Sequence, residues 1–235
     1  MTVSRKRTVI LVSGRGSNMN ALMEAASDPA YPAEIVGVIS DNEDAHALQV
    51  AAARGIATQI VNHASKADQD AAIDAVLTEF QAEIIALAGY MRLLSASFVE
   101  NWLGRIINIH PSLLPSFKGL DPHSRALEAG VKIHGCSVHF VTAAMDDGPI
   151  IAQAAVPVLA GDDEALLAAR VLKAEHGLYP LALRLVAENK ISMKERKTHL
   201  SNGGSGLVES ADSLLMSPAD LREEVDLEAL ARFTP

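Results

Sequence analysis

Three polar side chains near the middle of the sequence could carry out group-transfer chemistry: Asn108, His110 and Asp146. Asn108 and His110 are two positions apart at the end of an apolar run, so on a β-strand both side chains would project from the same face. A carboxamide can stabilise an oxyanion, an imidazole can transfer a proton, and a carboxylate can orient that imidazole. If the three groups meet in a cleft, they predict a site for acyl or formyl transfer.

Strands and helices alternate through the first half of the chain and would position these groups. Apolar runs predict strands over 7–13, 34–40, 57–61, 83–88 and 105–109. Amphipathic segments predict helices over 19–27, 45–54, 66–80 and 96–102. This alternation is typical of an α/β fold with a mostly parallel, Rossmann-like sheet and helices on both faces. Ligands of such sheets bind beyond the carboxyl ends of the strands, which is where segments 14–18, 89–94 and 108–115 fall.

The pattern changes after Pro115. A short helix is predicted over 123–129, and a long amphipathic helix over 163–187 with an interruption near Gly177 to Pro180. Between them, two alternating segments, 136–142 and 150–158, predict an antiparallel pair of strands added at the edge of the sheet, joined across an Asp-Asp-Gly-Pro turn.

Composition excludes several classes of protein. A formal net charge of −9 and a pI of about 5.3 argue against a general nucleic-acid or membrane-surface binder. No apolar run reaches the roughly 18 residues of a membrane span, and the N-terminus lacks the pattern of a signal peptide. The single cysteine, Cys136, cannot form an intramolecular disulfide, so we expect a cytoplasmic protein.

A glycine-containing turn, Gly14-Arg15-Gly16-Ser17-Asn18, follows the first predicted strand. Free N–H groups at the start of the next helix would favour an anion such as phosphate. The spacing matches neither G-x-G-x-x-G, because position 19 is Met, nor a P-loop. Two interpretations therefore stay open: a phosphate-binding loop, or a tight connection between strand and helix.

Several other residues have ordinary structural explanations. None of the eight histidines has the helical spacing or the cysteine partners of a zinc site, so no metal site is expected. His139 alternates with apolar neighbours and is predicted to be a core or edge residue. Taken singly, Asp146 could merely form a turn, Arg92 could be structural, and Glu175 could lie on a solvated helix face.

Five segments together resemble the folate-dependent formyltransferases, most of all the branch that acts on glycinamide ribonucleotide (GAR) in purine biosynthesis. The resemblance extends from about Thr8 to Lys190, and it is most specific in Ser13-Gly-Arg-Gly-Ser-Asn18, Leu87-Ala-Gly-Tyr-Met-Arg92, Ile107-Asn-Ile-His-Pro-Ser-Leu-Leu-Pro115, Gly135-Cys-Ser-Val-His-Phe-Val141 and Met145-Asp-Asp-Gly-Pro149. It implies transfer of the formyl group of 10-formyltetrahydrofolate to the amine of GAR. It also implies small-molecule substrates, no metal, and a monomer or homodimer.

The resemblance implies a role for each matching residue. Asn108 and a protonated His110 would stabilise the oxyanion, while Asp146 would support the imidazolium and assist proton transfer to the leaving N10. The phosphate and ribose of GAR would be held by Gly14, Arg15, Gly16, Ser17, Asn18 and Glu175. The folate would be held by Met91, Arg92, Leu93, Leu94, Val141 and Asp147. Asp147 stands where some members carry glycine, which puts the flexibility of its loop in question.

This resemblance predicts a formyltransferase domain over 1–200, with a phosphate-binding half at about 1–103 and a catalytic and folate-binding half at about 104–200. Beyond it, the segment 201–235 has seven acidic and two basic residues and is interpreted as a partly flexible acidic tail.

Three alternatives are weighed against the transferase. A formyltetrahydrofolate deformylase usually has an added N-terminal regulatory domain, and a first strand beginning by Arg7 leaves no room for one. A methionyl-tRNA formyltransferase has a larger C-terminal RNA-binding domain, for which the acidic tail is a poor match. A non-catalytic nucleotide-binding module would make Asn108 and His110 structural, and the presence of all three catalytic positions argues against it.

Overall fold

The structure is a computed structural model that describes residues 5–201, so the tail predicted at 201–235 lies outside the described residues apart from Ser201. The strands within this range are β1 (Lys6–Val12), β2 (Ala33–Ser40), β3 (Thr58–Ile60), β4 (Ile84–Leu87), β5 (Ile106–His110), β6 (Ile133–Phe140), β7 (Ile150–Pro157), β8 (Ile191–Lys194) and β9 (Lys197–Leu200). The helices are α1 (Ser17–Ala26), α2 (His46–Ala53), α3 (Lys66–Glu79), α4 (Ala96–Asn101), α5 (Pro122–Glu128) and α6 (Glu164–Ala187).

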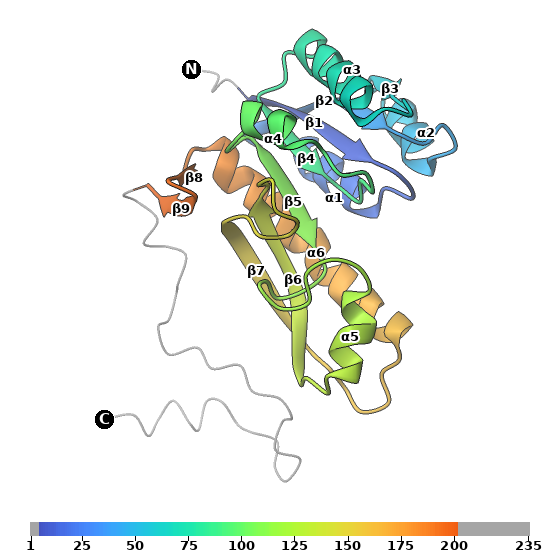
Figure 1. The fold of residues 1–235 in the computed structure, drawn as a ribbon, viewed down its shortest axis with the longest axis vertical. Coiled ribbons are helices and arrows are strands. Elements are labelled where there is room, and N and C mark those ends of the chain that lie inside the picture. The colour runs from blue at the N-terminus through green and yellow to red at the C-terminus, as the bar shows by residue number, and fades with distance from the viewer. Residues whose placement is uncertain (1–4, 202–235) are drawn as a thin grey trace.

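Seven strands form one sheet in the order β3-β2-β1-β4-β5-β6-β7 (Figure 1). The five strands from β3 to β5 are parallel to one another, whereas β6 runs antiparallel to β5, and β7 runs antiparallel to β6. The predicted α/β fold, a mostly parallel sheet with an antiparallel addition in the C-terminal half, is therefore confirmed. The sheet runs through both expected halves of the domain, and the boundary near residue 103 stays a prediction.

Apolar side chains on the two faces of the sheet pack against different helices. Along β1, Ile10 and Val12 join the cluster that includes the buried faces of α1, α2 and α6. Val9 and Leu11 point the other way and join the cluster beneath α3 and α4. A strand that is buried on both faces needs a continuous apolar run, which is why β1 shows no polar alternation.

A step in the sheet marks the place where β4 ends and β5 continues. The pairing of β4 with β5 stops at Leu87 opposite Asn108, whereas the pairing of β5 with β6 continues to His110 opposite Ser137. Figure 1 shows β5, β6 and β7 extending past the end of β4. The polar side chains of β5 therefore lie beside the loop that follows β4.

The predicted interruption of the last long helix is wrong. α6 is continuous from Glu164 to Ala187, with Pro180 inside it. An internal proline removes one backbone hydrogen bond and costs roughly 3 kcal/mol. Here the buried stripe of α6, which packs across β5, β6 and β7, outweighs this cost.

Other element boundaries also differ from the predictions. α1 begins at Ser17, two residues before the predicted start at Met19. β6 begins at Ile133, three residues before the predicted strand. The antiparallel hairpin of β8 and β9 was not predicted. Within residues 5–201, no helix is long and apolar enough to cross a membrane.

Candidate active site

Loops that follow several strands meet at the step in the sheet. The loop after β1 is joined to the loop after β4 by two hydrogen bonds: Ser13 N donates to Gly89 O over 3.1 Å, and Met91 N donates to Ser13 Oγ over 2.9 Å. These bonds bring the predicted phosphate loop and the predicted folate loop side by side. The carboxyl ends of parallel strands are where α/β sheets bind their ligands.

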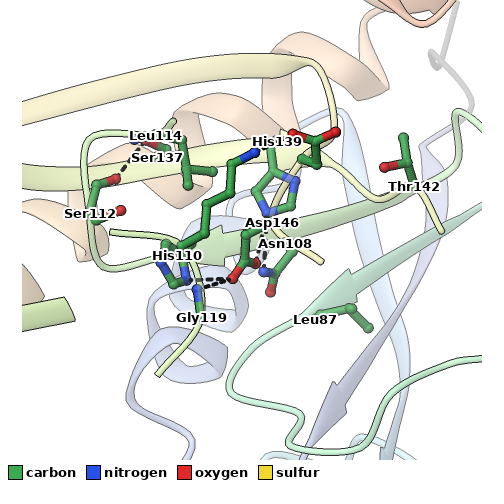
Figure 2. Close-up of polar contacts among 12 residues, drawn as sticks. Leu87, Asn108, His110, Ser112, Leu114, Gly119, Ser137, His139, Thr142 and Asp146 are labelled. Atoms are coloured by element: carbon green, nitrogen blue, oxygen red, sulfur yellow. Dashed lines mark hydrogen bonds and ion pairs between the residues drawn. The ribbon is translucent and has the colours of Figure 1, made fainter. Parts of the chain in front are cut away.

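The structure brings His110 and Asp146 together, as the sequence predicts. His110 Nδ1 lies 3.4 Å from Asp146 Oδ2, and Gly119 N donates to the same carboxylate oxygen over 2.9 Å (Figure 2). On the other side of the ring, Nε2 lies 3.0 Å from Phe117 O. Because a carbonyl and a carboxylate can only accept hydrogen bonds, both ring nitrogens face acceptors. This geometry suits a doubly protonated, cationic imidazole.

Asp146 is held as a carboxylate in a mostly buried position. Burial alone would raise the pKa of Asp146, but the hydrogen bond from the Gly119 N–H group and the positive charge of a protonated His110 bring this pKa below its ordinary value. The residue also adopts a left-handed backbone conformation with a φ of 49°. Non-glycine residues in this conformation concentrate at functional sites, where the surrounding structure must hold them.

His139 also belongs to this site, a role that the sequence did not predict. The side chain is only 2% exposed, as expected for a core residue. However, its Nε2 atom lies 3.2 Å from Asn108 Nδ2 and 3.7 Å from Asp146 Oδ1 (Figure 2). His139 stands directly opposite Asn108 in the antiparallel pairing of β5 and β6. Knowing this register would have identified the contact, but the sequence does not specify it.

The loop after β5 is anchored to the neighbouring strand. Ser137 Oγ on β6 donates to Ser112 O over 2.7 Å and accepts from Leu114 N over 2.9 Å. Farther along the loop, the side chain of Lys118 forms an ion pair with Asp147. The loops on either side of His110 and Asp146 are therefore joined to each other and to the sheet.

The predicted phosphate loop forms the start of α1. Gly16 has a left-handed backbone with a φ of 78°, and a Cβ atom added there would lie 2.7 Å from Ala47 Cβ. Gly14 has open space around it, and Arg15 is exposed. The first backbone bond of the helix runs from Asn20 N to Gly16 O, so the preceding N–H groups, including that of Ser17, are free of intrahelical bonds.

Asn18 and Glu175 lie far apart in the sequence but are in contact. Asn18 Nδ2 donates to Glu175 Oε2 over 2.7 Å, which links α1 to α6. Glu175 is 5% exposed, and burial raises the pKa of its carboxyl group despite the opposing effect of the Asn18 hydrogen bond. The Asn18 Oδ1 atom is buried without a hydrogen-bond partner among the described residues. A buried pair of this kind can accept hydrogen bonds from hydroxyl groups.

The predicted folate residues lie on the loop after β4 and on the loop after β6. Met91 and Leu93 are 69% and 65% exposed, whereas Leu94 and Val141 are partly buried against the core. The guanidinium of Arg92 donates to His63 O over 2.7 Å and to Asn62 Oδ1 over 3.2 Å. Asp147 is exposed. The described residues hold no group of three or more His, Cys, Asp or Glu side chains arranged to bind a metal ion.

Comparison with known proteins assigns the chain to a family. The sequence model described as Formyl transferase matches residues 6–183. The chain belongs to the formyl transferase family. Residues 6–183 contain every member of the predicted site, from the loop after β1 to Glu175 on α6.

Individual members of the formyl transferase family are similar over most of the chain. The phosphoribosylglycinamide formyltransferase of Escherichia coli K12 is 43% identical over 196 residues, which are 82% of this chain and 92% of that protein. A crystal structure of phosphoribosylglycinamide formyltransferase from Brucella melitensis is 58% identical, has a TM-score of 0.76, and is matched over 78% of this chain and 96% of that chain. The trifunctional purine biosynthetic protein adenosine-3 of Gallus gallus is 46% identical over 195 residues; the match covers 82% of this chain but only 19% of that longer protein.

Proposed function

We propose that this chain transfers the formyl group of 10-formyltetrahydrofolate to the primary amine of glycinamide ribonucleotide. The observation that carries the proposal is the arrangement of His110, with its two ring nitrogens facing a carbonyl and the carboxylate of Asp146, beside Asn108 on the same strand. The Escherichia coli and Brucella melitensis relatives, whose names specify this activity, support the choice of substrate.

The folate co-substrate would be held by side chains around the step. Met91, Leu93 and Met145 expose apolar surface on loops at the step, and Val141 lies at the start of one of them. Arg92 adds a guanidinium that suits a carboxylate. An apolar surface with a few placed polar groups is typical of sites for small-molecule ligands. Bound there, the folate would supply an activated formyl group on N10.

The ribonucleotide would be held on the other side of the step. Free N–H groups at the start of α1, together with Gly14 to Asn18, would bind the phosphate. Arg15 would add a positive charge. Glu175 and the buried Oδ1 atom of Asn18 would accept hydrogen bonds from the ribose hydroxyl groups.

The catalytic side chains would act on the charges that develop during transfer. The amine nitrogen forms a bond to the formyl carbon, the bond from that carbon to N10 breaks, and one proton moves from the amine to N10. Asn108 would donate an N–H group to the formyl oxygen as negative charge develops on it. His110 would donate to the same formyl oxygen through Nε2, in place of the hydrogen bond that Nε2 makes to Phe117 O in this structure. Asp146 would stabilise the cationic ring and assist the proton transfer.

The test is the absorbance change that accompanies loss of the formyl group from 10-formyltetrahydrofolate, measured with and without glycinamide ribonucleotide. We expect loss only when the ribonucleotide is present, with formation of the formylated ribonucleotide. Loss without the ribonucleotide would identify a deformylase. Absence of loss in both reactions, with both compounds binding, would identify a non-catalytic binding module.

A further inference from the structure

His139 and Asn108 form a cross-strand pair inside the candidate active site. They face each other in the antiparallel ladder of β5 and β6, where opposite side chains lie on the same face. The pairing of β6 with β7 shifts register between Val138 and His139, beside the point at which His139 enters the site. Such irregularities are over-represented next to active sites, where they redirect a side chain.

The surroundings of His139 fix the position of its ring proton. Nδ1 lies 2.9 Å from Phe140 O, and because a carbonyl oxygen can only accept, Nδ1 must carry a hydrogen. The loop after β6 crosses this carbonyl so closely that a Cβ atom added to Gly148 would lie 1.7 Å from Phe140 O. In the neutral ring, Nε2 therefore has a lone pair and acts as an acceptor.

This lone pair determines the orientation of the Asn108 amide. Asn108 Nδ2 lies 3.2 Å from His139 Nε2 and donates one of its two hydrogens to it. The second hydrogen is free to reach a substrate oxygen. If the amide turned over, its oxygen would face the lone pair of Nε2 and the two acceptors would repel each other. The ring thus favours the orientation that presents an N–H group.

We propose that His139 is a positioning residue that holds the Asn108 amide with its N–H group directed at the formyl oxygen. The inference rests on the proposed function, because it assigns a purpose to the Asn108 donor. Asp146 is the other neighbour through which His139 could act, but its Oδ1 atom is 3.7 Å from Nε2, which is too long for a hydrogen bond. In this tautomer Nε2 also has no hydrogen to donate.

Two substitutions separate this role from a purely structural one. The amide of Gln reaches the place of Nε2 and can accept from Asn108, whereas the shorter amide of Asn reaches only the place of Nδ1 and can bind only Phe140 O. We expect His139→Gln to keep kcat within about fivefold of the wild type, and His139→Asn to lower kcat by about 10- to 100-fold with little change in either KM. Thermal unfolding of both variants shows whether they are folded. Recovery by Asn and not by Gln would overturn the proposal.

A double substitution tests whether His139 acts through Asn108. In an Asn108→Ala background, His139→Asn should cause no further loss of kcat, because the group that His139 orients is already gone. A further loss of tenfold or more would show that His139 acts through another group and would overturn the proposal.

NMR of the His139 ring tests the role of His139 without measuring formyl transfer. The ring ¹⁵N shifts of His139, assigned by comparison with His139→Gln, should show a protonated Nδ1 and an unprotonated Nε2 at pH 7.5. The Nε2 resonance should move in Asn108→Ala. A protonated Nε2 would overturn the inference even in an active enzyme. A wild-type protein without transferase activity but with these shifts would instead contradict the proposed function alone.

Discussion

His110 lies between the Phe117 carbonyl and the Asp146 carboxylate, so each ring nitrogen faces a hydrogen-bond acceptor. Replacing this group should therefore remove catalysis without removing a large part of the core. We expect His110→Ala to lower kcat by about 10²- to 10⁴-fold, measured by formyl transfer. His199→Ala, at an exposed position on β9, is the matched control and should leave kcat unchanged. Turnover near the wild-type rate in His110→Ala would exclude the mechanism.

Asp146 contributes a negative charge, so its neutral isostere should change the pH dependence as well as the rate. Asp146→Asn removes the anion that lies 3.4 Å from His110 Nδ1, which makes the protonated imidazole less favourable. We expect kcat to fall by about 10- to 100-fold and the pH–rate profile to move to lower pH. A slower enzyme with an unmoved profile would show that Asp146 has no electrostatic role in the reaction.

At the scale of secondary structure, the turn from β1 to α1 contains two glycines with different purposes. Gly16 is left-handed and packed against Ala47, so Gly16→Ala should lower the free energy of unfolding by about 1–3 kcal/mol. Gly14 has open space, so Gly14→Ala should change this free energy by less than about 0.5 kcal/mol. The methyl group that Gly14→Ala adds would lie in the turn proposed to bind phosphate. It should instead raise the KM for the ribonucleotide by about tenfold and leave the KM for the folate unchanged. Denaturant titration and kinetics test the pair, and an unchanged KM in Gly14→Ala would separate this turn from phosphate binding.

Elements with strong local signals were predicted from the sequence, and elements defined by long-range contacts were not. The buried strands have continuous Val and Ile runs ending in glycine or polar turns. The β8–β9 hairpin was missed because its two turn residues, Glu195 and Arg196, have positive φ values of 49° and 57°, a conformation usually signalled by Asn or Gly. The continuity of α6 depends on packing against the sheet, which local propensity at Pro180 does not reveal.

The same distinction applies to the site. Asn108 and His110 could be paired from the sequence because their spacing places them on one face of one strand. Asp146 and Asn18 were candidates from their residue types and positions, but their specific roles, like that of Glu175, were assigned through the family resemblance. His139 was missed because its contact with Asn108 depends on the register between β5 and β6, and nothing local in the sequence sets that register.

At the scale of the whole molecule, stability should depend on pH through a buried histidine. Burial and the nearby His123 lower the pKa of His134 from 6.5 to about 4, with a hydrogen bond to Pro111 O opposing the shift. Between these pH values the unfolded chain binds more protons than the folded chain, so the free energy of unfolding falls as the pH falls. A shift of this size corresponds to a loss of about 1–3 kcal/mol.

Denaturant titrations at pH 7 and pH 4.5 would measure this loss. His134→Gln removes the titrating group and should make the difference between the two pH values smaller, although the variant should be less stable at pH 7. His199→Ala should retain the full difference because that side chain is exposed. If the free energy of unfolding changes equally between pH 7 and pH 4.5 in His134→Gln and in the wild type, the pH dependence comes from other groups.

The strand order sets a length requirement on any substrate that uses both ends of the site. The glycine turn proposed to bind phosphate follows β1, the proposed catalytic residues Asn108 and His110 lie on β5, and β4 is the single strand between β1 and β5. Because neighbouring strands are about 4.8 Å apart, the proposed phosphate-binding end and the proposed reacting end are separated by about 10 Å. A molecule with its phosphate and its amine closer together than this can engage one end but not both. Discrimination against substrates whose phosphate and amine are too close together is therefore a property of the sheet, and it would remain if the loops changed.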